Sequence, residues 1–118
     1  MKVLLKRIEA VIGRNNREKQ LACGEIILFP DKKQVYKNEK EIILTAREYQ
    51  LLEYLMYNQW RVLSREMIED HIWNFDYEGG TNVVDVYISY LRKKIDDGYD
   101  KKLIHTVRGR GYIMREEI

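Results

Sequence analysis

The stretch from residue 81 to about residue 95 constrains the fold of this chain more than any other segment. On a helix, with about 100° between residues, a narrow apolar stripe would form from Val84, Ile88, Leu91 and Ile95. A second stripe would lie roughly 100° further round and consist of Val83, Tyr87, Tyr90 and Lys94, with Val86 and Lys93 beside it and Arg92 on the far flank of the apolar stripe. Packing against a single hydrophobic core uses only one face of a helix. The second face is therefore either covered by another element of the same domain or left for a partner.

The chemistry of that second face suits a nucleic-acid groove. Aliphatic, tyrosine and lysine side chains can meet base edges and the flanking phosphates. The whole chain has 21 Lys and Arg against 19 Asp and Glu, which does not by itself indicate a nucleic-acid-binding protein. From Asn82 to Arg115, however, the sequence has eight basic residues against four acidic ones. The basic charge is concentrated in the carboxyl-terminal third.

A predicted hairpin near the carboxyl terminus places two arginines at its tip. The β-rich segments 103–107 and 112–114 flank Arg108, Gly109, Arg110 and Gly111, and the glycines permit positive φ and a tight reversal. A narrow finger with arginines at its point can enter a minor groove, where the negative potential is enhanced. The alternative is an ordinary solvated turn.

The first half of the chain divides into short strands followed by helices. Residues 21–44 predict a small antiparallel meander with strands at 25–29, 34–37 and 41–44. Thr45 and Glu48 form a capping box for a helix that ends near Asn58. Ser64 caps a second helix that ends near Trp73 and turns Met67, Ile68 and Ile72 inward, a loop covers 74–80, and Thr81 caps the third helix.

Composition and motifs exclude several classes of protein. The 118 residues suffice for one domain, and no apolar run could span a membrane. The apolar run after Met1 is interrupted by charged residues too early to form the hydrophobic region of a signal peptide. The single cysteine, Cys23, rules out an internal disulfide and a cysteine-built zinc site. We expect Cys23 to lie in a strand and to be inert. We therefore expect a cytoplasmic protein.

Enzyme chemistry finds little support in the sequence. Asp96, Asp97 and Asp100 are better explained as solvated acids than as metal ligands, and His71 and His105 lack neighbours that would orient a catalytic base. We expect His71 in or at the rim of the helical core and His105 on a wing strand. No glycine-rich phosphate loop follows a strand and opens a helix. The sequence predicts neither enzymatic activity, nor a cofactor, nor a metal.

Several separate motifs occur in an order that resembles a known family. They are Leu44-Thr45-Ala46-Arg47-Glu48-Tyr49-Gln50-Leu51-Leu52, Val62-Leu63-Ser64-Arg65-Glu66, Ile72-Trp73, Val84-Asp85-Val86-Tyr87-Ile88-Ser89-Tyr90-Leu91-Arg92-Lys93-Lys94 and Thr106-Val107-Arg108-Gly109-Arg110-Gly111-Tyr112. Over about residues 21–115 the chain resembles the OmpR/PhoB-type DNA-binding domain of two-component response regulators. The resemblance implies an α+β winged helix-turn-helix: a four-stranded antiparallel sheet, a three-helix core and a carboxyl-terminal hairpin wing.

The resemblance also implies how DNA would be bound. The third helix would lie in the major groove, and the candidate base contacts are Val83, Val86, Tyr87, Tyr90 and Lys94. Candidate backbone contacts are Thr45, Arg65, Trp73, Asn82, Arg92 and Lys93, and the minor-groove wing would carry Arg108 and Arg110. Arginine, histidine and arginine are frequent in the family where this chain has Asn82, Tyr87 and Tyr90. Tyr90 cannot form arginine's bidentate bond to guanine, so the resemblance does not fix which base is preferred there.

Two segments outside this core carry further expectations. The loop with Phe75, Asp76, Tyr77 and Glu78 corresponds to the family's RNA-polymerase contact, although it could be merely a long loop packed on its own domain. Residues 1–20 resemble the last receiver-domain helix and the interdomain linker, with 21–118 as the winged-helix domain. Within this segment one helical face would carry Val3, Leu4, Ile8, Val11 and Ile12, and the alternative is that this apolar face packs on the winged-helix domain.

The resemblance implies a monomer in solution and tandem binding to direct repeats, under indirect control of a sensor kinase through the receiver domain. A winged-helix module that binds a protein and never reads DNA is the alternative function.

Overall fold

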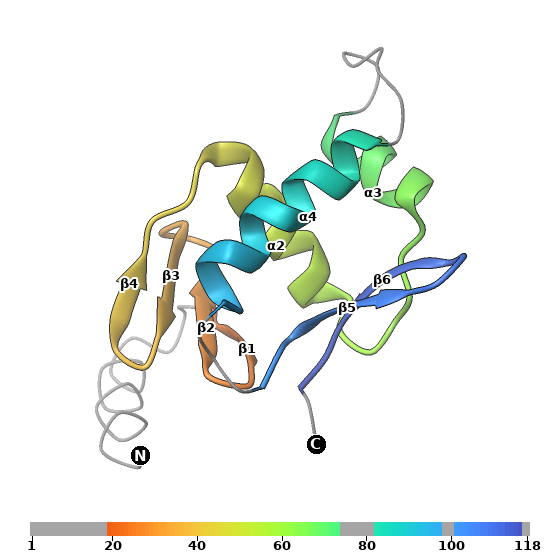
Figure 1. Cartoon of the computed structure of the whole chain (residues 1–118). Helices are drawn as coiled ribbons and strands as arrows, with labels where there is room; N and C mark the ends of the chain where they lie inside the picture. Colours follow the sequence, from red (N-terminus) through yellow and green to blue (C-terminus); the bar gives the residue numbers. More distant parts are fainter. Residues whose placement is uncertain (1–18, 74–81, 98–100, 117–118) are drawn as a thin grey trace.

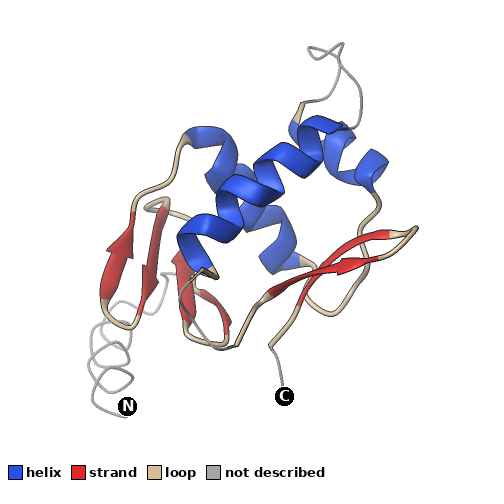
Figure 2. Cartoon of the chain, in the orientation of Figure 1, coloured by secondary structure: helices blue, strands red, loops and turns tan. Residues whose placement is uncertain are grey.

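The computed structural model describes residues 19–73, 82–97 and 101–116. Within these ranges a four-stranded antiparallel sheet is followed by three helices and a two-stranded hairpin (Figures 1 and 2). The elements are β1 (Leu21–Cys23), β2 (Ile26–Phe29), β3 (Gln34–Lys37), β4 (Lys40–Ile42), α2 (Ala46–Tyr57), α3 (Arg65–Ile72), α4 (Asn82–Ile95), β5 (Ile104–Val107) and β6 (Gly111–Met114). This confirms the expected α+β architecture.

The sheet is a simple meander in the order β1-β2-β3-β4. Lys37 pairs with Lys40, so Asn38 and Glu39 alone form the turn between β3 and β4, with φ of 52° and 69°. Positive φ at both central residues is the signature of a tight hairpin turn whose twist matches the strands. The last strand therefore begins one residue earlier than predicted and ends at Ile42, before the chain turns into the cap of α2.

Side-chain caps determine where two of the helices begin. The capping box of α2 is present: Thr45 N donates to Glu48 Oε1 at 2.9 Å, and Glu48 N donates to Thr45 Oγ1 at 3.3 Å. Ser64 Oγ accepts from Met67 N at 3.1 Å at the start of α3. The expectation that Met67 points inward is wrong, because Met67 is 38% exposed. Ile68 and Ile72, four residues apart, supply the buried stripe of this short helix. The predicted Thr81 cap lies outside the described residues.

The core lies between the sheet, the helices and the base of the hairpin, and α4 crosses it (Figure 1). The predicted apolar stripe of α4 is confirmed, because each of its four members is at most 1% exposed: Val84, Ile88, Leu91 and Ile95. They pack in one cluster with side chains from β2, β3, α2, α3 and β6. The buried face of α4 fixes which way its remaining faces point.

A buried polar cluster holds the carboxyl end of α4. Lys37 Nζ donates to the Ile95 carbonyl at 2.7 Å, and Lys37 is 3% exposed. The Asp96 carboxylate accepts from Leu103 N at 3.0 Å and Ile104 N at 3.1 Å. Asp96 is also 3% exposed, so the prediction of a solvated acid is wrong at this position: the carboxylate satisfies two buried backbone donors. Burial lowers the pKa of Lys37, although the negative charge of Asp96 opposes that shift.

The hairpin, which we call the wing (residues 104–114), is joined to the segment between α2 and α3. Leu63 N donates to the Tyr112 carbonyl at 2.8 Å and Tyr112 N donates to the Leu63 carbonyl at 3.0 Å. Gly111 makes this approach possible: with φ of +141°, a Cβ there would lie 2.0 Å from Leu63 O. Strand β6 of the wing is therefore paired with the α2–α3 segment as well as with β5, at a position close to the wing tip. Among the residues that the structure describes, no helix is long and apolar enough to cross a membrane.

Candidate nucleic-acid interface

One sector of α4 remains exposed after folding. It consists of Asn82, Val86, Ser89, Tyr90 and Lys93, which together span about 100° of the helix circumference. We call this sector the exposed face. Lys94 lies beyond Tyr90 and is also exposed, but it is bound to Glu48. Val86 is 40% and Tyr90 45% exposed, so two large apolar side chains lie within this one sector. Of the two alternatives for the second face of this helix, complete coverage by the chain itself is therefore excluded for the described residues.

The flank of α4 next to α2 and α3 is partly covered by the domain. The Tyr87 ring lies 5.3 Å from the Trp73 ring and 5.3 Å from the Tyr90 ring, both edge to face. Val83 and Tyr87 pack against the core, so Tyr87 is half-buried rather than fully presented as predicted. Lys94 Nζ binds Glu48 Oε1 at 2.7 Å. The predicted second stripe is thus divided between a packed flank and the exposed face.

Glu48 connects the α2 cap to this flank. The residue is 4% exposed, and its carboxylate receives both the Thr45 N–H and the Lys94 ammonium. Burial by itself raises the pKa of Glu48, but the hydrogen bonds from Lys94 and Thr45 outweigh burial and hold the pKa below its usual value. The carboxylate is therefore stabilised in its charged form, and it holds the Lys94 ammonium beside α2.

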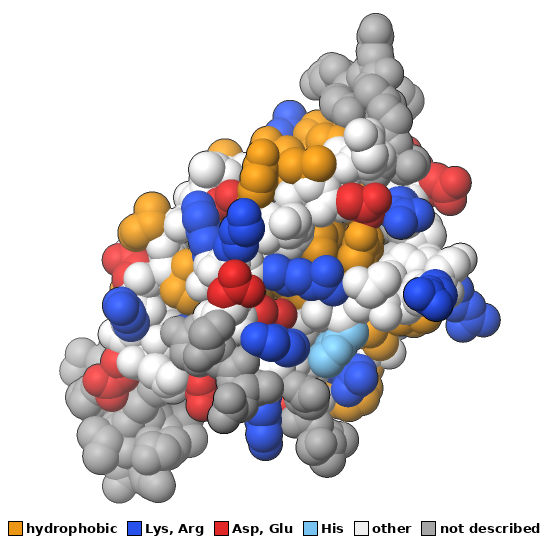
Figure 3. Space-filling view, viewed as in Figure 1, with side chains coloured by type: hydrophobic (Ala, Val, Ile, Leu, Met, Phe, Trp, Pro, Cys, Tyr) orange, Lys and Arg blue, Asp and Glu red, His pale blue; other side chains and the backbone are white. Residues whose placement is uncertain are grey.

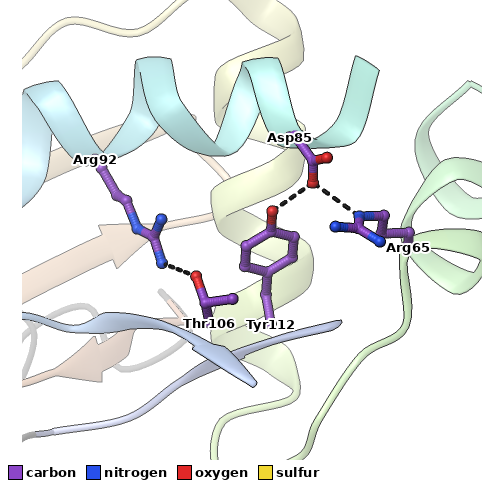
Figure 4. Close-up of polar contacts among 5 residues, drawn as sticks. All are labelled: Arg65, Asp85, Arg92, Thr106 and Tyr112. Carbon is purple, nitrogen blue, oxygen red and sulfur yellow. Dashed lines mark hydrogen bonds and ion pairs between the residues drawn. The ribbon is translucent and has the colours of Figure 1, made fainter. Parts of the chain in front are cut away.

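The opposite flank of α4 is bound to the wing (Figure 4). Asp85 accepts hydrogen bonds from the Tyr112 hydroxyl and from Arg65 Nε, the latter at 2.9 Å. Arg92 donates to Thr106 Oγ1 at 2.8 Å and to the Ile104 carbonyl at 3.2 Å. The wing consequently lies along one side of α4 and leaves the exposed face uncovered.

The wing tip has the predicted form. Arg108, Gly109 and Arg110 are exposed, Gly109 has φ of +75°, and Arg110 N donates to the Val107 carbonyl at 2.9 Å. Figure 3 shows Lys and Arg side chains distributed over α4 and the wing, with hydrophobic and acidic side chains between them. The exposed face and the arginine tip therefore belong to one mixed basic and apolar surface.

The remaining predicted contact residues occupy different environments. Thr45 and Asn82 are exposed at helix amino termini, whereas Trp73 is 7% exposed with the Arg47 guanidinium 5.7 Å over its ring. Arg47 also donates to the Ile72 carbonyl, which orders the end of α3 beneath Trp73. The predicted polymerase-contact residues Phe75, Asp76, Tyr77 and Glu78 lie outside the described residues, as does the amino-terminal segment up to residue 18.

The sequence interpretation missed three residues of this surface. Ser89 lies at the edge of the exposed face opposite Tyr90, and its helical spacing from Asn82 and Lys93 could have identified it. Asp85 and Tyr112 connect α4 to the wing across 27 residues of sequence. No local pattern predicts that hydrogen bond.

The cysteine and the two histidines, which the sequence analysis considered for other chemistry, have structural environments that can be described. Burial raises the pKa of Cys23 to about 11, assisted by the charges of Glu116 and Asp96, so the thiol is protonated and unreactive at neutral pH. His71 is exposed rather than in the core, and its ring stacks on Tyr54 with centroids 3.9 Å apart. His105 lies on β5, as expected. Among the described residues, no group of three or more His, Cys, Asp and Glu side chains could hold a metal ion.

The order of elements and the arginine-tipped hairpin define a winged helix-turn-helix domain. Residues 39–114 match the family model described as the carboxyl-terminal domain of transcriptional regulatory proteins, and the chain belongs to this family. The match confirms the resemblance to OmpR/PhoB-type domains.

Similar proteins support the same classification. The uncharacterized transcriptional regulatory protein YkoG of Bacillus subtilis is 45% identical over 95% of this chain and 51% of its own length. The alkaline phosphatase synthesis transcriptional regulatory protein PhoP of the same organism is 36% identical over 98% of this chain and 51% of its own. The chain thus spans about half the length of these relatives.

Solved structures share the fold. The Klebsiella pneumoniae RstA DNA-binding domain, in a crystal structure with the RstA box, is 28% identical with a TM-score of 0.73, over 82% of this chain and 97% of that one. The Thermotoga maritima response regulator DrrB, an OmpR/PhoB homologue, is 25% identical with a TM-score of 0.75, over 97% of this chain and 52% of that one.

Proposed function

We propose that this chain binds double-stranded DNA in a sequence-specific manner, as the output domain of a phosphorylation-controlled response regulator that regulates transcription. The observation that carries the proposal is the exposed face of α4, which retains large apolar and cationic side chains beside an arginine-tipped wing. A recognition helix in the major groove and a wing in the minor groove would use both features at once. The crystal structure of the similar RstA DNA-binding domain in complex with the RstA box supports DNA binding by this chain.

Base reading would centre on Val86 and Tyr90, the exposed large hydrophobic side chains of α4. Val83 and Tyr87 would contribute from the partly packed flank. Lys94 would reach a base only by leaving Glu48, because the two side chains are joined in the free protein. Ser89 joins this set as an additional candidate, since hydroxyl groups can bond to several base edges.

Contacts to phosphates would position the helix without reading sequence. Asn82 and Lys93 lie on the exposed face, and Thr45 lies at the exposed amino terminus of α2, where helix dipoles favour anions. Arg65, Arg92 and Trp73 complete the set inferred from the family. Arg108 and Arg110 would enter the adjacent minor groove.

The wider context of the chain follows from the family. Residues 1–20 would be the end of the receiver domain and the linker, and phosphorylation directed by a sensor kinase would act through that receiver. The domain would be a monomer alone and would bind direct repeats in tandem, with Phe75, Asp76, Tyr77 and Glu78 contacting RNA polymerase. Such a protein would act in the cytoplasm, without enzymatic activity of its own.

Selection of bound duplexes from a random pool tests the proposal. The expected result is enrichment of a sequence motif as a direct repeat, with affinity that falls steeply as salt rises because counterions are released. No enrichment, together with binding to all duplexes that is weak and equal, would favour the alternative of a winged-helix module that binds protein. Enriched palindromes would retain DNA reading but contradict the tandem arrangement.

A further inference from the structure

Two residues on the same side of α4 hold the two strands of the wing. Asp85 and Arg92 are seven residues apart, which places them two turns apart on nearly the same side of the helix. Asp85 accepts from the hydroxyl of Tyr112 on β6, and Arg92 donates to Thr106 on β5. These two connections fix both wing strands against one helix.

The wing residues that receive these contacts are themselves partners. Thr106 and Tyr112 lie opposite each other in the β5–β6 register. The Arg92 guanidinium also lies 5.6 Å from the centre of the Tyr112 ring, so it contacts both strands. A cross-strand pair near the tip is thus held at two points, a short distance before Arg108.

The hairpin needs such support. An isolated two-stranded hairpin is marginally stable in water, and its direction would vary if only its base were fixed. The backbone pairing of Tyr112 with Leu63 fixes the wing to the α2–α3 segment, but it does not involve α4. The side-chain bonds to Asp85 and Arg92 are the connections that set the wing relative to the exposed face.

The surroundings of Asp85 also stabilise its carboxylate in the charged form. It lies in the first turn of α4, where the helix dipole favours a carboxylate, and it binds Arg65 as well as Tyr112. The Arg65 side chain remains 49% exposed while its Nε binds Asp85. The Asp85 carboxylate on α4 therefore binds one residue of α3 and one residue of the wing.

We propose that Asp85 and Arg92 are positioning residues that hold the wing at a fixed offset from α4, so that Arg108 meets the minor groove at a set distance from the bases read by Tyr90. The inference rests on the proposed DNA-binding function and adds to it. Neither residue has to touch a base to act in this way. If Asp85 and Arg92 position the wing, removing their contacts with it should reduce the contribution of Arg108 to DNA affinity.

The test is a double-mutant cycle on the selected duplex. Tyr112→Phe removes only the hydroxyl that binds Asp85, and Thr106→Val removes only the hydroxyl that binds Arg92. Together they form what we call the released background, in which both hydroxyl contacts near the tip are lost and Arg92 keeps only its hydrogen bond to the Ile104 carbonyl further from the tip. In the unmodified chain, Arg108→Ala should weaken binding on the order of tenfold, as expected for loss of one charged groove contact. In the released background the same substitution should cost less than about threefold, because the arginine is already misplaced.

Controls separate positioning from unfolding and from failure of the proposed function. Tyr90→Ala should cost the same factor in both backgrounds. Thr106→Ser, which keeps the hydroxyl that binds Arg92, should show the full Arg108 effect that Thr106→Val reduces. Thr106 is exposed, so Thr106→Val alone keeps the test available if the double variant does not fold; it should reduce the Arg108 effect in the same direction. An Arg108 effect that is equal in both backgrounds, or absent in the unmodified chain, overturns the positioning role. If the unmodified chain shows no preference for any DNA sequence, the proposed function itself is overturned instead.

Discussion

Lys37 and Ile95 are bound to each other across 58 residues of sequence: the buried ammonium of Lys37 donates to the last carbonyl of α4 at 2.7 Å. Carbonyl groups at the end of a helix have no partner within the helix, so they need one from elsewhere. Lys37 supplies it from β3, and the positive charge also complements the helix dipole. The amino-terminal sheet therefore determines where the carboxyl end of α4 lies.

Removal of the Lys37 side chain should destabilise the domain. Lys37→Ala leaves the Ile95 carbonyl without this donor and should cost about 1–3 kcal/mol of unfolding free energy. Urea denaturation followed by circular dichroism measures the change. Lys40→Ala is the matched control, because Lys40 pairs with Lys37 in the neighbouring strand but is exposed; it should change stability by less than about 0.5 kcal/mol. Equal costs for both variants would show that the buried hydrogen bond contributes nothing.

The two glycines of the wing tip should respond differently to alanine. Gly109 has φ of +75° with open space around it, so Gly109→Ala should cost only the backbone strain, about 1–2 kcal/mol. Gly111→Ala would place a Cβ 2.0 Å from Leu63 O and should cost clearly more, because the wing must separate from the α2–α3 segment. Thermal melting of the two variants side by side decides this. If Gly111→Ala is the milder change, the described approach of wing and Leu63 is wrong.

Acid should destabilise the domain partly through Glu48. Its folded-state pKa lies below the usual 4.5, so its contribution is present above about pH 4.5 and is lost as the pH falls through the lower folded value. Asp85 acts in the same sense: burial raises its pKa, but the Tyr112 and Arg65 hydrogen bonds outweigh burial and lower it. Urea midpoints measured between pH 6 and pH 3 should fall less for Glu48→Gln than for the unmodified chain. Parallel curves would contradict the role of Glu48.

Much of the fold follows from local rules that can be applied to the sequence. Thr45 with Glu48 specifies a helix start through bonds between residues three apart, and the Val84–Ile95 stripe specifies a buried helix face through periodicity alone. The arginine tip follows from alternating glycines. These features need no knowledge of distant residues.

Other features depend on packing between distant elements, which the sequence pattern does not contain. Asp96 resembles a solvated acid at a helix end, but the fold brings two unpaired backbone donors onto it. Tyr87 fits an exposed stripe by angle, yet Trp73 at the end of another helix covers part of it. The Asp85–Tyr112 bond likewise exists only once the wing is placed.

A phosphate contact should differ from a base contact in its salt dependence. Lys93→Ala should weaken binding to all duplexes about equally and reduce the slope of log affinity against log salt by roughly one unit. Lys93 lies on the exposed face of α4, where a long cation can reach the DNA backbone. Anisotropy titrations at several salt concentrations measure the slope. A slope that stays unchanged would remove Lys93 from the set of phosphate contacts.

The most direct test of the central claim is the effect of Tyr90→Ala on the ratio of specific to random affinity. Tyr90 is 45% exposed at the edge of the exposed face beside Tyr87, so its loss should spare the fold, which circular dichroism checks. If α4 reads bases through this face, Tyr90→Ala should cost about 1–3 kcal/mol on the selected site and much less on random duplex. A ratio of specific to random affinity equal to that of the unmodified chain would contradict the account, because α4 would then not be reading DNA through this face.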